Sequence, residues 1–426
     1  LNSQFGVGLT GEGYLQDIRK RKAKDSKSIY ILDEMAMCNR DLLFAVCRCL
    51  GEDDIVYFLG DCKQLPPIGK GNPFHILMQL LPCIELGVSK RAAEGSNVNY
   101  NTTLVNCLSD GVEEELLYDD SSFLCEEVSN ADIPITSMKV WKGLMDGTYN
   151  GKRYEEDDIQ IISGYATPEK SFSSSSLNPI IQRFLRQHDK LLFTHANKNF
   201  YKKDRVIHTR LNSYGTQRYL EVENNVFKSV VTLGIMNGEV GKILGVVRTD
   251  LVEIMDFDPK DIEEEPEVYG SLDKADIERL LEDREKKAEK IRNDSNFKNS
   301  NYYFVKVRVY DSDLGRDVIV LYPARSSQQD DILYLGGEDL DNLDLAYALT
   351  THKMQGSQSM AILLPFGTDC SPTFINRNMI NTMITRSQEV VVMIGDIKGR
   401  DSAVNKGRRF ASEVKCNDLL TFLCEN

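Results

Sequence analysis

The stretch that decides the fold contains two apolar runs, each followed by acidic side chains: IYILDEM at residues 29–35 and IVYFLGDCKQLPPIGKGNP at residues 55–73. Both apolar runs have the length and composition of buried strands. The carboxyl ends of neighbouring parallel strands meet at one edge of a sheet, so we expect Asp33, Glu34 and Asp61 to face one crevice. The sequence therefore predicts an α/β fold on a parallel sheet, with a candidate site at the strand ends.

The side chains after these runs suit the hydrolysis of a nucleoside triphosphate. Asp33 can hold hydrated Mg²⁺ through carboxylate oxygen, Glu34 can orient an attacking water, and Gln64 is placed to contact a γ-phosphate. An isolated Asp-Glu pair is more simply the solvated end of a buried strand. The second run is much more specific, because it carries Gly-Asp-x-x-Gln-Leu-Pro-Pro-x-Gly at residues 60–69.

With these motifs the chain resembles the superfamily 1 DNA helicases of the RecD and Dda type. Asp33 and Glu34 match the Walker B pair of that family, and Gly60, Asp61 and Gln64 match the motif that follows it. Further matches occur in the family's order: ELGVSKR at 85–91, LNPIIQ at 177–182, DRVIHT at 204–209, NGEVG at 237–241, LAYALTTHKMQGS at 345–357 and NTMITR at 381–386.

The resemblance implies an α/β fold with two RecA-like motor domains, the first incomplete, and a small β-barrel inserted in the second. The expected boundaries are 1–92 for the rest of the first motor domain, 93–199 and 338–426 for the two parts of the second, and 200–337 for the barrel. Short β-like runs between residues 200 and 325 agree with a barrel. Within it, a charged insertion at 257–298 carries apolar residues at helical spacing over 271–292, which predicts an amphipathic or two-helix protrusion. The protrusion either packs on its own domain, which is the simpler interpretation, or serves as a partner-binding arm.

Local patterns give further expectations about single elements. They predict helices over 14–25 and near 41–50, a strand at 158–163, and a Ser-rich loop at 171–177 ahead of a helix at 179–186. Acidic blocks at 110–127, 256–267 and 330–344 are expected to be solvated loops.

The resemblance also implies roles for individual residues, with ATP and Mg²⁺ as cofactors and the metal on Asp33. In this family the arginines reach the nucleotide when the cleft between the motor domains closes. The implied catalytic residues are Asp33, Glu34, Gln64, Arg91 and Arg386. The implied nucleotide-binding residues are Gly60, Asp61, Gln355 and Gly356, and the implied nucleic-acid-binding residues are Thr351, His352, Lys353, Asn178, Arg205 and Asn237. Met354 and Ala92 stand where the family often has polar residues.

One motif of the family is absent from the sequence. The phosphate-cradling loop reads Gly-x-x-x-x-Gly-Lys-Ser/Thr, whereas GVGLTG at 6–11 is followed by Glu12 and Gly13. We expect a preceding portion that carries the loop to be missing from the sequence; the competing interpretation is a degenerate motor kept for binding. The chain by itself is expected not to hydrolyse ATP.

Composition narrows the class of protein. The formal net charge is −14, yet a local basic group at Lys198, Lys202, Lys203, Arg205 and Arg210 either faces DNA or solvates a strand edge. The ten cysteines contain no Cys-x-x-Cys pair, which argues against a zinc site and favours free thiols in a reducing, intracellular compartment. No apolar run reaches the roughly 18 residues of a membrane span, so no membrane partner is expected.

The resemblance implies an ATP-dependent helicase that moves 5′ to 3′ on single-stranded DNA and separates duplex strands. Replication or recombination proteins are further candidate partners. Two alternatives stay open. One is a non-hydrolysing nucleic-acid-binding subunit whose Phe193, Phe200, Tyr201 and Tyr214 stack on bases. The other is a viral-type RNA helicase, because the motor motifs do not distinguish the sugar.

Overall fold

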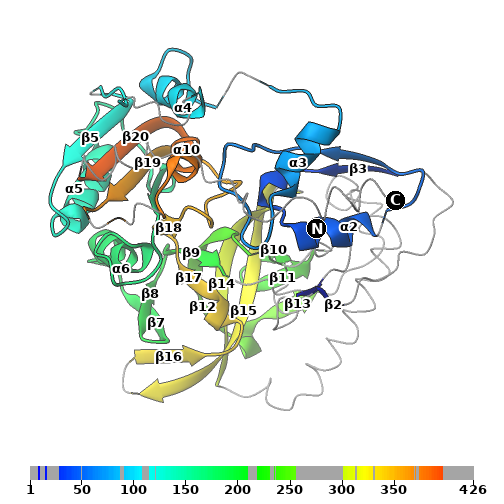
Figure 1. The fold of residues 1–426 in the computed structure, drawn as a ribbon. Helices are drawn as coiled ribbons and strands as arrows, with labels where there is room; N and C mark the ends of the chain where they lie inside the picture. Colours follow the sequence, from blue (N-terminus) through cyan, green and yellow to red (C-terminus); the bar gives the residue numbers. More distant parts are fainter. Residues whose placement is uncertain are drawn as a thin grey trace. The chain divides into compact units, whose positions relative to one another are not determined.

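The computed structural model describes residues 8–9, 15–16, 28–48, 50–86, 91–107, 115–119, 121–209, 218–230, 235, 237–255, 301–311, 314–329, 332–368, 370 and 374–396. The chain divides into two compact units. Unit 1 comprises Leu1–Leu177 and Ala348–Asn426, and unit 2 comprises Asn178–Tyr347. The expected α/β class is confirmed, since unit 1 contains parallel sheets with helices packed on them (Figure 1).

The first parallel sheet of unit 1 has two strands, β3 (Ile29–Leu32) and β4 (Ile55–Phe58), where the apolar runs predicted them. Helix α2 (Arg40–Cys47) lies between them in sequence, and α3 (Pro73–Leu80) follows β4. The side-chain oxygen of Asn39 caps α2 by accepting from the amide of Leu42 at 2.9 Å. The helix predicted near 41–50 therefore exists but ends earlier, at Cys47.

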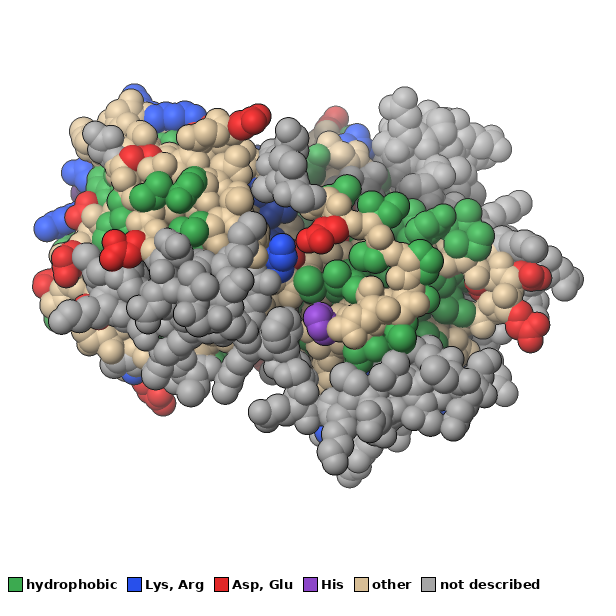
Figure 2. All heavy atoms as spheres, turned by 45° about the horizontal axis from the view of Figure 1, so that its top comes forward, with side chains coloured by type: hydrophobic (Ala, Val, Ile, Leu, Met, Phe, Trp, Pro, Cys, Tyr) green, Lys and Arg blue, Asp and Glu red, His purple; other side chains and the backbone are tan. Residues whose placement is uncertain are grey.

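The two faces of this small sheet differ. One face packs with the helices into a core that includes Leu32, Leu43, Val46, Phe74 and Leu77. On the other face Ile29, Ile31, Ile55 and Tyr57 are between 50% and 66% exposed. Figure 2 shows hydrophobic side chains gathered in the part of the view where Figure 1 places β3 and α3. Strand ends held from one side by this core leave their acidic side chains accessible.

The second parallel sheet has five strands in the order β18 (Ala348–Thr350), β6 (Ile159–Ser163), β19 (Ser359–Phe366), β20 (Ser387–Gly395) and β5 (Phe123–Glu127). All neighbours pair in parallel. Strand β6 confirms the strand predicted at 158–163, and its five residues are all buried, as expected inside a parallel sheet covered on both faces. Helices α4 (Asn97–Cys107), α5 (Ile133–Asp146) and α10 (Arg377–Ile384) pack against it.

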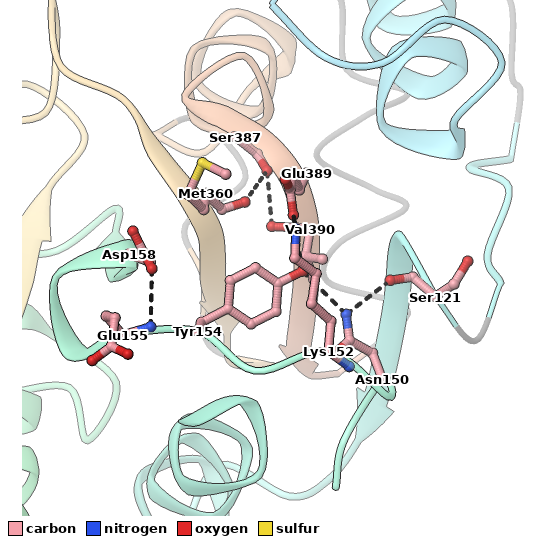
Figure 3. Close-up of polar contacts among 10 residues, drawn as sticks. All are labelled: Ser121, Asn150, Lys152, Tyr154, Glu155, Asp158, Met360, Ser387, Glu389 and Val390. Atoms are coloured by element: carbon pink, nitrogen blue, oxygen red, sulfur yellow. Dashed lines mark hydrogen bonds and ion pairs between the residues drawn. The ribbon is translucent and has the colours of Figure 1, made fainter. Parts of the chain in front are cut away.

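The start of β20 is anchored by the segment that leads into β6 (Figure 3). The carboxylate of Glu389 accepts a hydrogen bond from the Tyr154 hydroxyl at 3.2 Å and pairs with Lys152. The hydroxyl of Ser387 donates to the backbone oxygen of Val390 at 2.8 Å. These contacts fix the strand that directly follows Arg386.

The described residues of unit 2 form an 11-stranded, mostly antiparallel sheet. Its strands are β7 (Leu191–His195), β8 (Lys198–Tyr201), β9 (Arg205–His208), β10 (Arg218–Glu223), β11 (Val226–Ser229), β12 (Val240–Arg248), β13 (Glu253–Met255), β14 (Tyr302–Asp311), β15 (Arg316–Gln329), β16 (Ile332–Gly336) and β17 (Leu343–Leu345). Within the described residues β13 and β17, the two ends of the main strand path, do not pair with each other. The sheet is established, and the closed barrel and the domain boundaries remain predictions.

Some predicted elements were wrong. Helix α6 (Ser174–Leu185) begins inside the expected Ser-rich loop, because the Ser173 hydroxyl accepts from the amide of Ser176 at 3.2 Å and so begins the helix. Two acidic blocks contain strands, β5 in 110–127 and β16 and β17 in 330–344.

The helix expected over 14–25 is contradicted where it is described, since Leu15–Gln16 form strand β2, paired with β1 (Gly8–Leu9). The insertion at 257–298 and the block at 256–267 lie outside the described residues. Across the described ranges, no helix has the length and apolar character needed to cross a bilayer.

Candidate functional site

The predicted acidic site residues, Asp33, Glu34 and Asp61, lie just after the ends of β3 and β4. The amide of Leu59 donates to the Leu32 oxygen at 2.8 Å, and the amide of Met35 donates to the Leu59 oxygen at 2.9 Å. Asp33 is exposed, and its Oδ1 accepts from the amide of Glu34 at 2.7 Å. The two strands therefore end at one edge, as expected, and Asp33 is accessible there.

The backbone of Glu34 adopts a conformation that side chains with a Cβ rarely take. Its φ of 55° and ψ of 38° are left-handed, and it precedes the short 3-10 helix η1 (Met35–Met37). Non-glycine residues in this region cost roughly 1–2 kcal/mol, and such strain gathers at functional sites. The Glu34 side chain is half-buried.

Gly60 has a packing reason to be glycine. A Cβ built on it would lie 3.1 Å from the amide nitrogens of Met35 and Ala36 and 3.1 Å from a ring carbon of Phe74. The close approach lets the segment after β4 lie against the turn that carries Glu34. Gly60 thus positions the site through its backbone, whether or not it also contacts a nucleotide.

The segment after Gly60 turns back so that Gln64 points toward the second parallel sheet. Asp61 organises the turn: Oδ1 accepts from the amide of Lys63 at 2.9 Å, and Oδ2 accepts from Nε2 of Gln64 at 3.3 Å. The remaining side-chain oxygen of Gln64 accepts from Nη2 of Arg386 at 3.2 Å. Two residues assigned to separate motifs therefore touch.

Arg386 is held in place on several sides. Only 1% of the residue is exposed; its Nε donates to the Thr382 oxygen at 3.1 Å and its Nη1 to the Ser357 oxygen at 3.4 Å. Burial lowers the pKa of Arg386 to about 10, with the Arg91 cation acting in the same direction and the carboxylates of Glu34 and Asp61 opposing it. The guanidinium remains charged at neutral pH, and four predicted site residues lie within electrostatic reach of one another.

Arg91, the second predicted arginine, reaches the same place. Its Nη1 donates to the backbone oxygen of Thr385 at 2.5 Å. Arg91 itself is exposed, so its side chain can exchange this partner for a ligand at low cost. The structure thus brings together Asp33, Glu34, Asp61, Gln64, Arg91 and Arg386.

Side chains of helix α10 hydrogen-bond to the backbone of the Gln64 segment, and these side chains were not among the predicted site residues. Asn378 Nδ2 donates to the oxygens of Lys63 and Gln64 at 3.2 and 3.0 Å, and Asn381 Nδ2 donates to the Lys63 oxygen at 3.1 Å. The hydroxyl of Thr382 accepts from the amide of Leu65 at 3.0 Å. The i, i+3, i+4 spacing of these polar residues places them on one helix face, which is the signal that would have found them.

The segment 351–357 links the two edges of the five-stranded sheet. At the carboxyl edge, the Thr351 amide and hydroxyl bond to the Ser163 oxygen at 3.1 and 3.3 Å. At the amino edge, the Ser357 oxygen accepts from Arg386. Gln355 and Gly356 lie between, Gly356 with a φ of 78°. The segment therefore connects the surroundings of Thr351 to those of Arg386.

The other residues of this segment differ in exposure. Thr351 is 1% and Met354 3% exposed, so the methionine that replaces a polar residue of the family packs inside the unit. His352 and Lys353 are half-buried, and burial lowers the pKa of His352. Of the three residues assigned here to nucleic acid, His352 and Lys353 present the accessible side chains.

The remaining nucleic-acid assignments lie in unit 2 and stay predictions. Asn178 and Arg205 are each 6% exposed, and Asn178 Nδ2 donates to the Leu345 oxygen at 3.1 Å. Asn237 is exposed. The basic group is only partly accessible. Lys198 pairs with Asp344 at 2.8 Å and Arg205 is buried, whereas Lys202 and Lys203 are exposed. The last member, Arg210, lies outside the described residues.

A buried network explains part of the motif at 204–209. Asp204 has no exposed surface and accepts from Gln182 Nε2 at 2.6 Å, the Tyr347 hydroxyl at 2.8 Å and Arg186 Nε at 3.3 Å. Burial raises the pKa of Asp204, and these bonds oppose the rise. The motif residues Asp204 and Gln182 thus hold unit 2 together.

Two of the aromatic residues suggested as base-stacking groups are unsuitable. Phe193 and Phe200 stack on each other, with ring centroids 4.9 Å apart and an interplanar angle of 13°, and each is 1% exposed. Neither ring face is open to a base, so this part of the binding-subunit alternative was wrong. Tyr201 is half-buried, and Tyr214 lies outside the described residues.

The residues fit a lightly coordinated Mg²⁺ better than a metal caged by protein. No group of three or more His, Cys, Asp or Glu side chains suited to a metal occurs in the described part of the chain. Mg²⁺ that is bound with a nucleotide needs only one or two carboxylates, because phosphates and waters complete its shell. The accessible Asp33 meets that requirement.

Residues 6–124 match the family model of the AAA domain, a match that includes β3, β4 and the Asp61–Gln64 turn. This agrees with the resemblance of the motifs to superfamily 1 helicases. No curated protein matches the chain.

Solved structures of Pif1 helicases are similar to the whole chain at low identity. One describes DNA unwinding at forked duplex DNA by two coordinating Pif1 helicases (14% identity, 100% of this chain and 83% of that chain, TM-score 0.41). Others are Pif1 from Bacteroides with ADP-AlF3 and ssDNA (15%, 100% and 82%, 0.37) and Pif1 from Candida albicans (13%, 93% and 77%, 0.36).

Proposed function

We propose that this chain carries the hydrolytic and strand-binding parts of an ATP-dependent DNA helicase, which moves on single-stranded DNA and separates duplex strands. The observation that carries the proposal is the contact between Gln64 and Arg386. It joins the acidic strand ends, whose residue types suit nucleotide hydrolysis, to a buried arginine that directly precedes strand β20 of the other parallel sheet. The match of residues 6–124 to the AAA domain supports the same class.

Each residue has a role that its position permits. Asp33 would hold Mg²⁺, which supplies charge neutralisation for the phosphates, and Glu34 would orient the attacking water. Gln64, through its amide, and Arg386, through its forked cation, would donate to oxygens of the transferred phosphoryl group. Arg91 would add a second cation at the same place. Gly60 and Asp61 would keep this group of side chains preorganised, so that little rearrangement is needed during reaction.

Coupling to the nucleic acid would pass through the segment 351–357. Lys353 and His352 follow the carboxyl end of β18, while Ser357 contacts Arg386 at the amino end of β19. A change in how Arg386 is bonded would therefore act on the segment that bears the proposed strand contacts.

The choice of substrate and direction rests on the motifs. DNA and 5′ to 3′ movement follow from the resemblance to RecD and Dda, as do roles in replication, repair or recombination and an intracellular location. A viral-type RNA helicase would use the same hydrolytic residues. Strand separation with matched DNA and RNA forks distinguishes the two.

The direct test is ATP hydrolysis with and without single-stranded DNA. Because the 426 residues contain no Gly-Lys-Ser/Thr loop, both this chain and the protein purified from its natural source are assayed. We expect DNA-stimulated turnover by the source protein, lost in its Glu34→Gln variant and kept in Glu52→Gln, an exposed carboxylate outside the site. Strand binding without turnover by the source protein would instead support the non-hydrolysing subunit.

A further inference from the structure

An aromatic surface stands at the carboxyl edge of the five-stranded sheet, beside the segment assigned to nucleic acid. Gly164 and Tyr165 directly follow β6, and the Thr351 amide donates to the oxygen of Ser163, the last residue of β6, at 3.1 Å. The start of 351–357 and the Tyr165 turn are therefore neighbours at one edge. We call Tyr165, Phe374 and Lys170 the aromatic step.

The rings of the step are anchored on one side and open on another. Tyr165 and Phe374 have centroids 5.1 Å apart at 39°, and Tyr165 meets the buried ring of Phe172 edge-on at 5.7 Å and 81°. Phe172 is 1% exposed, whereas Phe374 is 40% exposed. Phe374 thus rests on the Tyr165 ring, which itself packs on the buried Phe172, and it leaves part of its own surface in solvent, an arrangement suited to stacking on a flat partner.

The residue that follows Phe374 packs against the turn that carries Tyr165. A Cβ built on Gly164 would lie 2.3 Å from Cδ1 of Ile375, so the Ile375 side chain lies directly over this glycine. Asn376 then caps α10 by accepting from the amide of Met379 at 3.1 Å. The step therefore stands at the start of the helix whose other end leads to Arg386.

The charge beside the rings favours an anionic ligand. Nζ of Lys170 lies 5.8 Å from the centroid of the Tyr165 ring, and Lys353 belongs to the adjoining segment. A cation next to exposed aromatic surface is the pattern that binds the phosphate and base of a single strand, since every base has a π face. The buried rings of Phe193 and Phe200 cannot supply such a surface.

We infer that the aromatic step is a base-stacking site for single-stranded nucleic acid, with Phe374 as the principal ring and Lys170 as a phosphate contact. The inference rests on the proposed function, and it assigns that function a strand contact outside the helicase-like motifs. It predicts affinity without base preference, because neither contact reads a base edge.

The test is fluorescence anisotropy of a labelled oligothymidine with the full chain in the absence of nucleotide. Loss of one stacked base, roughly 1–3 kcal/mol, corresponds to about 5- to 150-fold weaker binding; we expect this for Phe374→Leu. Phe374→Trp restores the affinity. Tyr100→Leu removes a ring that is 49% exposed in α4 and leaves the affinity unchanged.

A second readout separates stacking from loss of structure. The fluorescence of 2-aminopurine in an oligonucleotide falls when a ring stacks on that base. We expect this fluorescence to be quenched on binding to the wild type, to Phe374→Trp and to Tyr100→Leu, and to be quenched less on binding to Phe374→Leu. Lys170→Gln should reduce the dependence of log affinity on log salt by about 0.7. Binding and quenching by Phe374→Leu equal to the wild type would overturn the inference alone, whereas a wild type that binds no single strand would overturn the proposed function with it.

Discussion

The side-chain oxygen of Gln64 accepts a hydrogen bond from Nη2 of Arg386 at 3.2 Å, joining residues 322 positions apart in sequence. The contact is braced from both sides: Asp61 holds the amide of Gln64, and the backbone of Thr382 and Ser357 holds the guanidinium. A bridge of this kind places a neutral amide and a cation at the strand ends that bear Asp33 and Glu34.

If Gln64 and Arg386 act as one unit, their removal should not be additive. We expect Arg386→Ala to lower ATP turnover by about 10³-fold or more. Gln64→Ala should lower it less, and the double variant should be close to Arg386→Ala alone. The measurement is the turnover number of the source protein in a double-mutant cycle with Gln79→Ala, an exposed glutamine in α3, as control. Multiplying effects would show that the two residues act independently.

The left-handed backbone of Glu34 should cost folding stability that the protein would regain with glycine, at the loss of the carboxylate. Glu34→Gly and Glu34→Ala both remove the carboxylate and should both abolish turnover. Only glycine relieves the strain at φ 55°, and part of this gain is offset by the greater freedom of glycine in the unfolded chain. We expect the glycine variant to be more stable than the alanine variant by about 0.5–1 kcal/mol, measured by urea unfolding. An alanine variant as stable as the glycine variant would argue against strain.

Gly60 should tolerate no side chain. Gly60→Ala places a methyl group 3.1 Å from two backbone nitrogens, and overpacking of this kind costs roughly 1–3 kcal/mol. Gly51→Ala is a matched control, since its Cβ meets only the Asp54 carboxyl group, at 3.5 Å or more. Chemical unfolding of both variants measures the difference, and equal stabilities would contradict the packing role.

His352 should make stability fall as the solution is acidified. Burial lowers the pKa of its folded form below the ordinary value of 6.5, so the unfolded chain takes up the proton first. Its contribution is therefore fully present above pH 6.5 and is lost as the pH falls toward the lower, folded pKa. Between pH 7.5 and 5.5 the free energy of unfolding of the wild type should drop more than that of His352→Gln. Parallel profiles would mean that His352 titrates normally.

What the sequence predicted well depended on strong local signals. The apolar runs before Asp33 and Gly60 specified β3 and β4, and the strand predicted at 158–163 was found as β6. Strand β5 was missed because Phe123–Glu127 sits in an acidic block, and its assignment depends on parallel pairing with the distant Val391–Gly395. Local charge could not reveal that partner, whose pairing overrides the local propensity.

For the site, too, local sequence patterns predicted single residues, whereas contacts between distant segments could not be predicted. The residue types at Asp33, Glu34, Gln64 and Arg386 were readable from motifs, but their contacts were not. The grip of Asn378 and Thr382 on the Gln64 segment and the aromatic step depend on segments that the fold brings together. Thr351 is buried whereas Lys353 is partly exposed, and the motif that contains both does not show this difference in exposure.

The proposed helicase function is tested most directly by strand separation of a forked DNA duplex by the source protein, followed together with ATP hydrolysis. We expect the wild type to separate the strands with ATP and not with a non-hydrolysable analogue, and we expect Arg386→Ala to bind the fork but neither to hydrolyse ATP nor to separate the strands. A wild-type protein that binds the fork without hydrolysing ATP, or an Arg386→Ala variant that unwinds normally, would contradict the proposed function.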